Sequence, residues 1–253
     1  MRRWTLCFSM VFLLSFLQLA DANDKKDRAV ELFFNAANEY KNAQYQEAVD
    51  HYTDILGQGL ESGPLYYNLG NAYFKTGDQG RAVLNYERAL RFMPRDNDLQ
   101  FNYRYVTASI KNYRKTRSEG LFQKMVDEHI KFYSRNEMVL ILTGIFFLAL
   151  FFWLLAFYCR WSFKVRLTGS ILCGILFVVF LAGLVFECQY AGNAAIVLDP
   201  ADAKFEPRDD ATTHFSMFEG ERIKTLRQDG GWLKIQRADG KEGWVDQNYV
   251  ERI

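Results

Sequence analysis

Cysteine and histidine are scarce in this chain of 253 residues, which has four of the first and three of the second. The cysteines all lie in or beside apolar stretches, at Cys7, Cys159, Cys173 and Cys188. The histidines stand in unrelated segments without metal-ligand spacing, at His51, His129 and His214. We therefore expect no disulfide and no thiol nucleophile in the polar parts of the chain, and no metal or other cofactor.

The chain also has no catalytic sequence motif that we recognise, and its net charge is small. The sequence has no P-loop, no glycine-rich dinucleotide fingerprint and no nucleophile elbow. The adjacent carboxylates of Asp209 and Asp210 fall in a predicted loop, where solvated charge is a simpler interpretation than an acid/base pair. A net charge of +1 provides no basic face for phosphates, which argues against nucleic-acid binding. We expect a non-enzymatic protein.

Two long apolar runs are present instead, over residues 138–158 and 167–186, and neither contains a charge. Each is long enough to cross a bilayer as a helix of roughly twenty residues. The break between them, residues 159–166, carries Arg160, Lys164 and Arg166 and no acid, so we place it in the cytoplasm. Both flanking polar domains then lie on the outer side of the membrane.

The N-terminus has the features of an export signal. Arg2 and Arg3 precede an apolar segment that ends at Ala20-Asp21-Ala22, a small-residue cleavage site. We expect residues 1–22 to be a signal peptide, although a retained membrane anchor would leave the polar domains on the same side.

Residues 23–117 have a helical pattern that recurs at a period of about 34 residues. The second copy has a pattern of small, aromatic and aliphatic residues that ends in a proline, namely Tyr66, Leu69, Gly70, Tyr73, Ala82, Tyr86, Ala89 and Pro94. This copy resembles the tetratricopeptide repeat, in which the two helices of a hairpin cross closely at the small residues, and Gly77 with Asp78 is expected to form the turn between them. A weaker first copy has Leu32, Ala36, Ala48, Tyr52 and Ile55. Residues 97–112 are predicted to form a capping helix, which would complete a short solenoid with a concave groove.

The repeat positions that line such grooves carry mostly aromatic residues here. They are Phe33, Tyr40, Tyr67, Asn71, Phe74, Phe101 and Tyr105. An aromatic groove suits an extended peptide or a partner helix better than a metabolite. Packing between the repeats is the alternative role for any one of these side chains.

Residues 118–137 have apolar side chains at mostly helical spacing among charged ones, which predicts an amphipathic juxtamembrane helix. It would lie at the membrane–water interface or pack against the solenoid. Ser134 and Glu137 fit a capping box for the first membrane helix.

Residues 191–253 change to short β patterns with glycine turns, and five strands are predicted at 195–198, 215–218, 222–226, 232–235 and 242–245. The run from Glu219 to Val245 resembles bacterial SH3-like domains, which are small all-β barrels. Trp232, Trp244 and Tyr249 are candidates for a peptide-binding surface, but the two tryptophans are also residues that such barrels bury.

The expected fold class is therefore a multidomain membrane protein with an all-α repeat solenoid, a two-helix transmembrane hairpin and a small all-β barrel. This order of parts resembles the BatE-type proteins of the bacterial aerotolerance (Bat) operon. The resemblance implies an inner-membrane protein with periplasmic domains, and membrane-anchored von Willebrand A-domain Bat proteins as partners in a complex linked to stress or aerotolerance. Two hypotheses follow, namely an assembly scaffold that binds envelope proteins, and a cell-wall sensor or tether that binds peptidoglycan peptides through the barrel.

Overall fold

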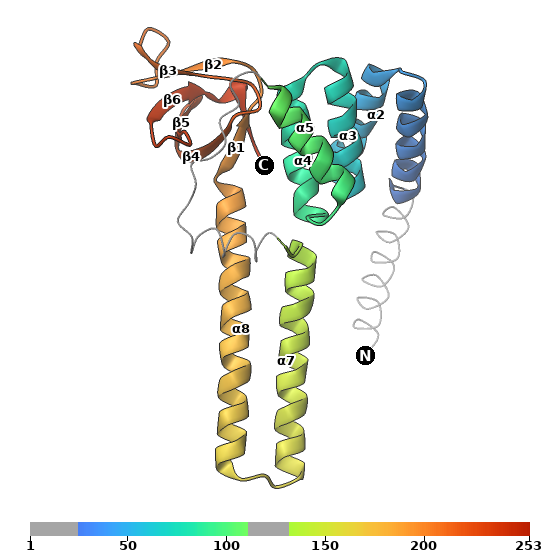
Figure 1. The fold of residues 1–253 in the computed structure, drawn as a ribbon, viewed down its shortest axis with the longest axis vertical. Coiled ribbons are helices and arrows are strands. Elements are labelled where there is room, and N and C mark those ends of the chain that lie inside the picture. The colour runs from blue at the N-terminus through green and yellow to red at the C-terminus, as the bar shows by residue number, and fades with distance from the viewer. Residues whose placement is uncertain (1–24, 111–131) are drawn as a thin grey trace, which may run out of the picture.

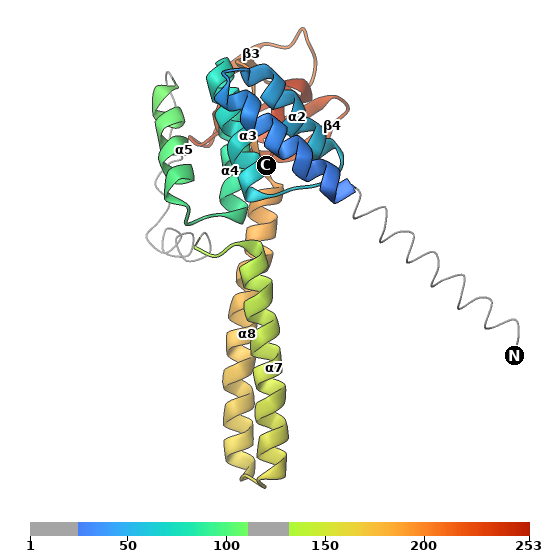
Figure 2. The same cartoon turned by 90° about the vertical axis from the view of Figure 1, so that its right-hand side faces the viewer.

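The computed structural model describes residues 25–110 and 132–253, apart from the side chains of residues 186–191. A helical domain and a β domain lie side by side at one end of a long helical hairpin (Figures 1 and 2). The predicted signal peptide and most of the predicted juxtamembrane helix lie outside the described residues. The fold class expected from the sequence is confirmed.

The helical domain consists of antiparallel helices stacked into a short solenoid (Figure 1). A helix over residues 25–41 is followed by α2 (Tyr45–Gly57), α3 (Gly63–Thr76), α4 (Gln79–Phe92) and α5 (Asn97–Ser109). The pair of α3 and α4 is the second predicted repeat, and α5 lies against it as the predicted capping helix.

The second repeat turns and crosses where the sequence predicts. Gly77 ends α3 in the left-handed region with a φ of 92°, which glycine adopts without steric cost. Asp78 then caps α4 by accepting a hydrogen bond from the backbone N–H of Arg81 at 2.8 Å. A Cβ on Gly70 would lie 2.8 Å from the ring of Tyr86, so the two helices approach as closely as a glycine permits.

The hairpin consists of α7 (Arg135–Tyr158) and α8 (Phe163–Gly192), both long and apolar enough to cross a membrane. The predicted capping box is confirmed: Ser134 accepts from the N–H of Glu137, whose carboxylate accepts from the N–H of Ser134 at 2.8 Å. The helices exceed the predicted apolar spans. Helix α8 begins before its apolar run does, so two of the three cations predicted in the loop, Lys164 and Arg166, lie in its first turn.

The β domain is one antiparallel sheet with the strand order β3-β2-β6-β5-β4-β1-β7, curled around its own core. The expected strands are present as β1 (Ala194–Val197), β3 (Thr213–Met217), β4 (Arg222–Asp229), β5 (Trp232–Gln236) and β6 (Glu242–Asp246). The prediction of five strands was wrong in number, because β2 (Ala201–Lys204) and β7 (Val250–Arg252) complete the sheet. Strand β2 has no β-branched or aromatic residue, and β7 has only three residues.

Candidate interaction surfaces

The groove side of the solenoid ends in an exposed aromatic cluster formed by Phe74 of α3 and by Phe101 and Tyr105 of α5. Phe74 meets Tyr105 edge to face with ring centroids 5.8 Å apart, and Phe101 stacks on Tyr105 at 6.5 Å. Phe101 is 62% exposed and Tyr105 is 57% exposed. We call these three residues the aromatic cluster. Phe101 and Tyr105 keep large apolar areas in solvent, whereas Phe74 is half-buried against the core of the solenoid.

Next to the aromatic cluster, a polar network joins three helices. The hydroxyl of Tyr86 in α4 donates to Oδ1 of Asn71 at 2.7 Å. The amide of Asn102 in α5 donates to the same oxygen and to the hydroxyl of Tyr67, both at 3.0 Å. Burial is the largest cause of the raised pKa of Tyr86, with smaller contributions from neighbouring tyrosines. Tyr67 and Asn71 therefore connect α3 with α4 and α5 through side-chain hydrogen bonds.

The two remaining predicted groove residues, Phe33 and Tyr40, lie in the first helix. Phe33 packs edge to face against Tyr52 with centroids 5.6 Å apart, and Tyr40 contacts Tyr45 at 5.3 Å. Burial raises the pKa of Tyr40, and the nearby Tyr45 and Tyr67 add to the effect. Phe33, Tyr40 and Tyr45 are half-buried and Tyr52 is buried, whereas Phe34 is 67% exposed.

The seven predicted groove residues thus fall into three local groups: the aromatic cluster, Tyr67 with Asn71, and Phe33 with Tyr40. Sequence reasoning missed Asn102, which connects the first two groups, and the exposed ring of Phe34.

The barrel has a cleft of about 550 Å³ on the side of β2, β3 and β5. Trp232 and Tyr249 line it together with Lys204, whose ammonium lies 5.3 Å from the centroid of the Trp232 ring. The remaining lining residues include Pro200, Asp202, Asp209 and Asp246. Trp244 is half-buried opposite Lys234 in the β5–β6 pair and does not line this cleft. Two of the three predicted barrel residues therefore share one surface.

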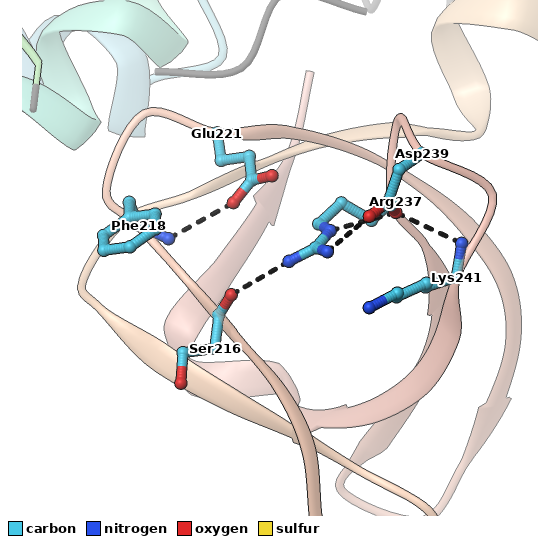
Figure 3. A network of polar contacts seen from close by, with 6 residues as sticks. All are labelled: Ser216, Phe218, Glu221, Arg237, Asp239 and Lys241. Carbon is cyan, nitrogen blue, oxygen red and sulfur yellow. Dashed lines mark hydrogen bonds and ion pairs between the residues drawn. The ribbon is translucent and has the colours of Figure 1, made fainter. Parts of the chain in front are cut away.

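A buried arginine fixes the barrel beside this cleft (Figure 3). The guanidinium of Arg237 donates to the carbonyl of Ser216 at 3.1 Å and to the carboxylate of Asp239 at 3.0 Å. The hydrogen bond from Arg237 is the main reason that the pKa of Asp239 falls to about 2. In the same view Glu221 accepts from the N–H of Phe218 at 3.3 Å, which closes the turn between β3 and β4.

Among the described residues, no group of three or more His, Cys, Asp or Glu side chains is placed to hold a metal ion. His51 pairs with Glu39 at 2.8 Å, and His214 lies between the rings of Phe205 and Phe215. Asp210 is exposed and lies 3.5 Å from Arg208. These contacts give the side chains structural roles, and His129 lies outside the described residues.

Comparison with known proteins identifies the two domains. Residues 63–96 match the family model of the tetratricopeptide repeat, and residues 206–251 match that of the bacterial SH3 domain. No curated protein matches the chain. Among solved structures, the C-terminal SH3 domain of Myosin IB from Entamoeba histolytica is 31% identical over 24% of this chain and 84% of that chain, with a TM-score of 0.20.

The chain is therefore a protein with two apolar helices long enough to span a membrane and with two modules of types that bind other proteins. Both modules are typically non-catalytic. The matches define the repeat and the barrel separately, rather than one family for the whole chain.

Proposed function

We propose that this protein is a non-enzymatic scaffold of the bacterial inner membrane, whose solenoid binds a protein partner on its groove side. Two observations support the setting. The helices α7 and α8 are long enough to cross the membrane, and Arg160, Lys164 and Arg166 lie between them or at the start of α8, as expected on the cytoplasmic side. Both modules are then periplasmic.

The exposure of the aromatic cluster is the observation that carries the proposal. Phe101 and Tyr105 leave more than half of their surfaces in solvent, although α5 has a buried face formed by Leu99 and Val106. Exposed aromatic side chains offer a large contact area at a low cost in conformational entropy, which is why they are frequent in binding hot spots.

The identity of the partner rests on the order of the parts. A signal peptide, repeats, a hairpin and a barrel in this order resemble the BatE-type arrangement, and we propose membrane-anchored von Willebrand A-domain Bat proteins as partners in an aerotolerance-linked complex. Such partners reside in the same membrane as this chain.

A second candidate function is a cell-wall tether, and the barrel cleft favours it. Trp232 and Tyr249 present aromatic surface in a cleft that also contains carboxylates and one ammonium group, which suits a short peptide with charged groups. Peptidoglycan peptides are the ligands that we propose for this alternative.

Recovery of partners from detergent-solubilised membranes separates the two functions. We expect Phe101→Ala with Tyr105→Ala to lower recovery of the Bat A-domain proteins at least tenfold without a change in circular dichroism. The matched control is Phe205→Ala, which removes a 59% exposed ring from the barrel and should leave recovery unchanged.

Sacculus binding and partner recovery are measured on these variants and on Trp232→Ala. Loss of sacculus binding in Trp232→Ala, with normal partner recovery, would favour the tether. Wild-type partner recovery by the Phe101 and Tyr105 double variant would remove the aromatic cluster from the mechanism.

A further inference from the structure

The outer side of α4 faces the barrel rather than solvent. One hydrophobic core contains Val83 and Leu84 of α4 together with Ile196 and Leu198 from the first strand of the barrel and the residue after it. Val83 and Ile196 have no exposed surface. The solenoid and the barrel therefore share one core, in addition to the separate core inside the barrel.

Two glycines let the surfaces approach closely. A Cβ on Gly80 in the first turn of α4 would lie 2.2 Å from the carbonyl oxygen of Leu198. A Cβ on Gly220, between β3 and β4, would lie 2.4 Å from Cδ1 of Ile110 and 3.3 Å from Cγ2 of Val83. A Cβ at position 80 would meet the backbone of Leu198, so the barrel would have to move away from α4 to make room for it, whereas at position 220 the side chain of Ile110 would have to move.

Hydrogen bonds within the barrel hold the turn that contains Gly220 in place. The N–H of Gly220 donates to the carbonyl of Val197 at 2.7 Å, and the N–H of Val197 donates to the carbonyl of Glu221 at 3.0 Å. The side chain of Glu221 also closes this turn, as Figure 3 shows. The barrel thus presents a preformed surface to α4 and Ile110.

Charged residues surround the apolar contact. Glu87 of α4 is 9% exposed and accepts from the hydroxyl of Tyr103 at 2.6 Å, while the guanidinium of Arg222 in β4 lies 3.3 Å away. Arg88 donates to the carboxylate of Glu251 at 2.7 Å and to the carbonyl of Arg252 at 2.8 Å. In the docked arrangement the largely buried carboxylate of Glu87 has donors from both domains, so its burial is compensated by hydrogen bonding and by an opposite charge.

The connections to α7 and α8 also bring the barrel and the outer side of α4 next to each other. Strand β1 begins at Ala194, immediately after α8 ends at Gly192. On the solenoid side, Arg95 follows α4, bonds to Glu137 in the first turn of α7 and lies over the ring of Phe132 at 4.9 Å. Since α7 and α8 are neighbours in one hairpin, the barrel reaches α4 of its own chain without a partner copy (Figure 1).

We infer that the outer face of α4 is a permanent docking surface for the barrel of the same chain, through β1, the Gly220 turn and Arg222, so that repeats and barrel form one rigid head. This docking occupies the outer side of the solenoid. It leaves the aromatic cluster and the barrel cleft accessible to other molecules, at a fixed distance from each other.

Distances between spin labels test the docking in the full chain in detergent. The four native cysteines are replaced by serine, and labels are attached to Glu47→Cys in α2 and Thr213→Cys in β3, both exposed positions. We expect one narrow distance distribution that survives dilution with unlabelled protein. A broad distribution, or one that disappears on dilution, would overturn docking within the chain.

Gly80→Ala should disrupt the docking, because its new Cβ would collide with the carbonyl of Leu198. We expect this variant to have a broader distance distribution. Gly57→Ala is the matched control at another helical glycine, where a Cβ has no atom within 4 Å, and it should leave the distribution narrow. Unchanged narrow distances in Gly80→Ala would contradict the proposal.

If Gly80→Ala loses its helical circular dichroism, a charge reversal at Arg222 tests the docking instead. Arg222→Glu sets a carboxylate against the largely buried Glu87 and should broaden the distribution while the spectrum is kept. Arg227→Glu makes the same change on the exposed part of β4, where the side chain is 69% exposed, and should have no effect. Equal distributions in the two variants would refute the docking.

Discussion

The two sides of the solenoid both carry large apolar side chains, yet within residues 25–110 and 132–253 only one of them is covered. On the outer side of α4, Val83 is fully buried beside the barrel turn at Gly220. On the groove side, Phe101 and Tyr105 of the neighbouring helix α5 remain mostly exposed. The covered side has close glycine contacts and paired charges, whereas the open side has stacked rings. This difference separates a contact that stabilises the fold from a surface that is available to a partner.

Truncation on the covered side should have the largest effect. Leu198→Ala removes a buried side chain next to Gly80 and leaves a cavity between the barrel and α4, so we expect a loss of about 2–5 kcal/mol in the free energy of unfolding. Thermal unfolding of the full chain in detergent measures it. A loss below about 0.5 kcal/mol, the range of ordinary surface changes, would mean that the barrel does not rest on α4.

Overpacking inside the solenoid should follow. Gly70→Leu forces a side chain against the ring of Tyr86 and should cost on the order of 1–3 kcal/mol or more. Unfolding followed by circular dichroism at helical wavelengths reports this change. Gly57→Leu serves as the control in open space, and an equal effect in both variants would contradict the close crossing of α3 and α4.

A smaller, pH-dependent effect is expected at Glu219, beside the docking turn. Burial, with Asp78 and Asp199 nearby, raises the pKa of Glu219 above its ordinary value of 4.5 in the folded protein. The folded chain therefore binds this proton more tightly than the unfolded chain does. The resulting stabilisation is fully present below the unfolded pKa and is lost as the pH rises through the folded pKa.

Glu219→Gln removes this dependence. The variant should gain stability relative to the parent at pH 7 and lose that gain as the pH approaches 4. Melting temperatures of parent and variant across this range provide the measurement, and a constant difference between them would show that the Glu219 carboxylate does not titrate with folding.

The smallest effect on stability is expected in the aromatic cluster. Phe101→Ala and Tyr105→Ala should each change the free energy of unfolding by no more than about 0.5 kcal/mol, because both rings are mostly in solvent. Tyr67→Ala removes an acceptor of the Asn102 amide and should cost more, about 1–3 kcal/mol. If Phe101→Ala proves as destabilising as Tyr67→Ala, the cluster is part of the core and not an open surface.

Local sequence signals predicted several structural details correctly. Gly77 and Asp78 end one helix and begin the next, and Ser134 and Glu137 form the capping box of α7. These features depend on backbone conformation and on hydrogen bonds between residues three or four positions apart, so a short stretch of sequence contains all the atoms involved.

The barrel edges were harder to predict. Strand β2 reads Ala-Asp-Ala-Lys and forms because β3 and β6 supply hydrogen-bond partners on both sides, not because its residues favour strands. The extension of α8 to Gly192 was missed for a related reason, since hydropathy marks the apolar span and not the end of the helix.

For the candidate site too, the sequence predicted some features and missed others. The repeat period placed seven residues along the groove, and their role in binding stays a prediction. The period alone did not separate Tyr67 and Asn71, which bond across helices, from Phe101 and Tyr105, which remain exposed. That separation depends on the position of α5 relative to α3, which is a matter of packing.

The sequence by itself determined the solenoid, the apolar hairpin, the barrel and the caps that delimit several of their helices, because each follows from periodicity, helix length or local hydrogen bonding. Only the tertiary structure decided which apolar faces are covered. Val83, Ile196 and Leu198 meet across more than a hundred residues of chain, and no local pattern reveals which surface will exclude water from another. The barrel therefore covers the outer side of α4, and the aromatic cluster of the groove is left in solvent.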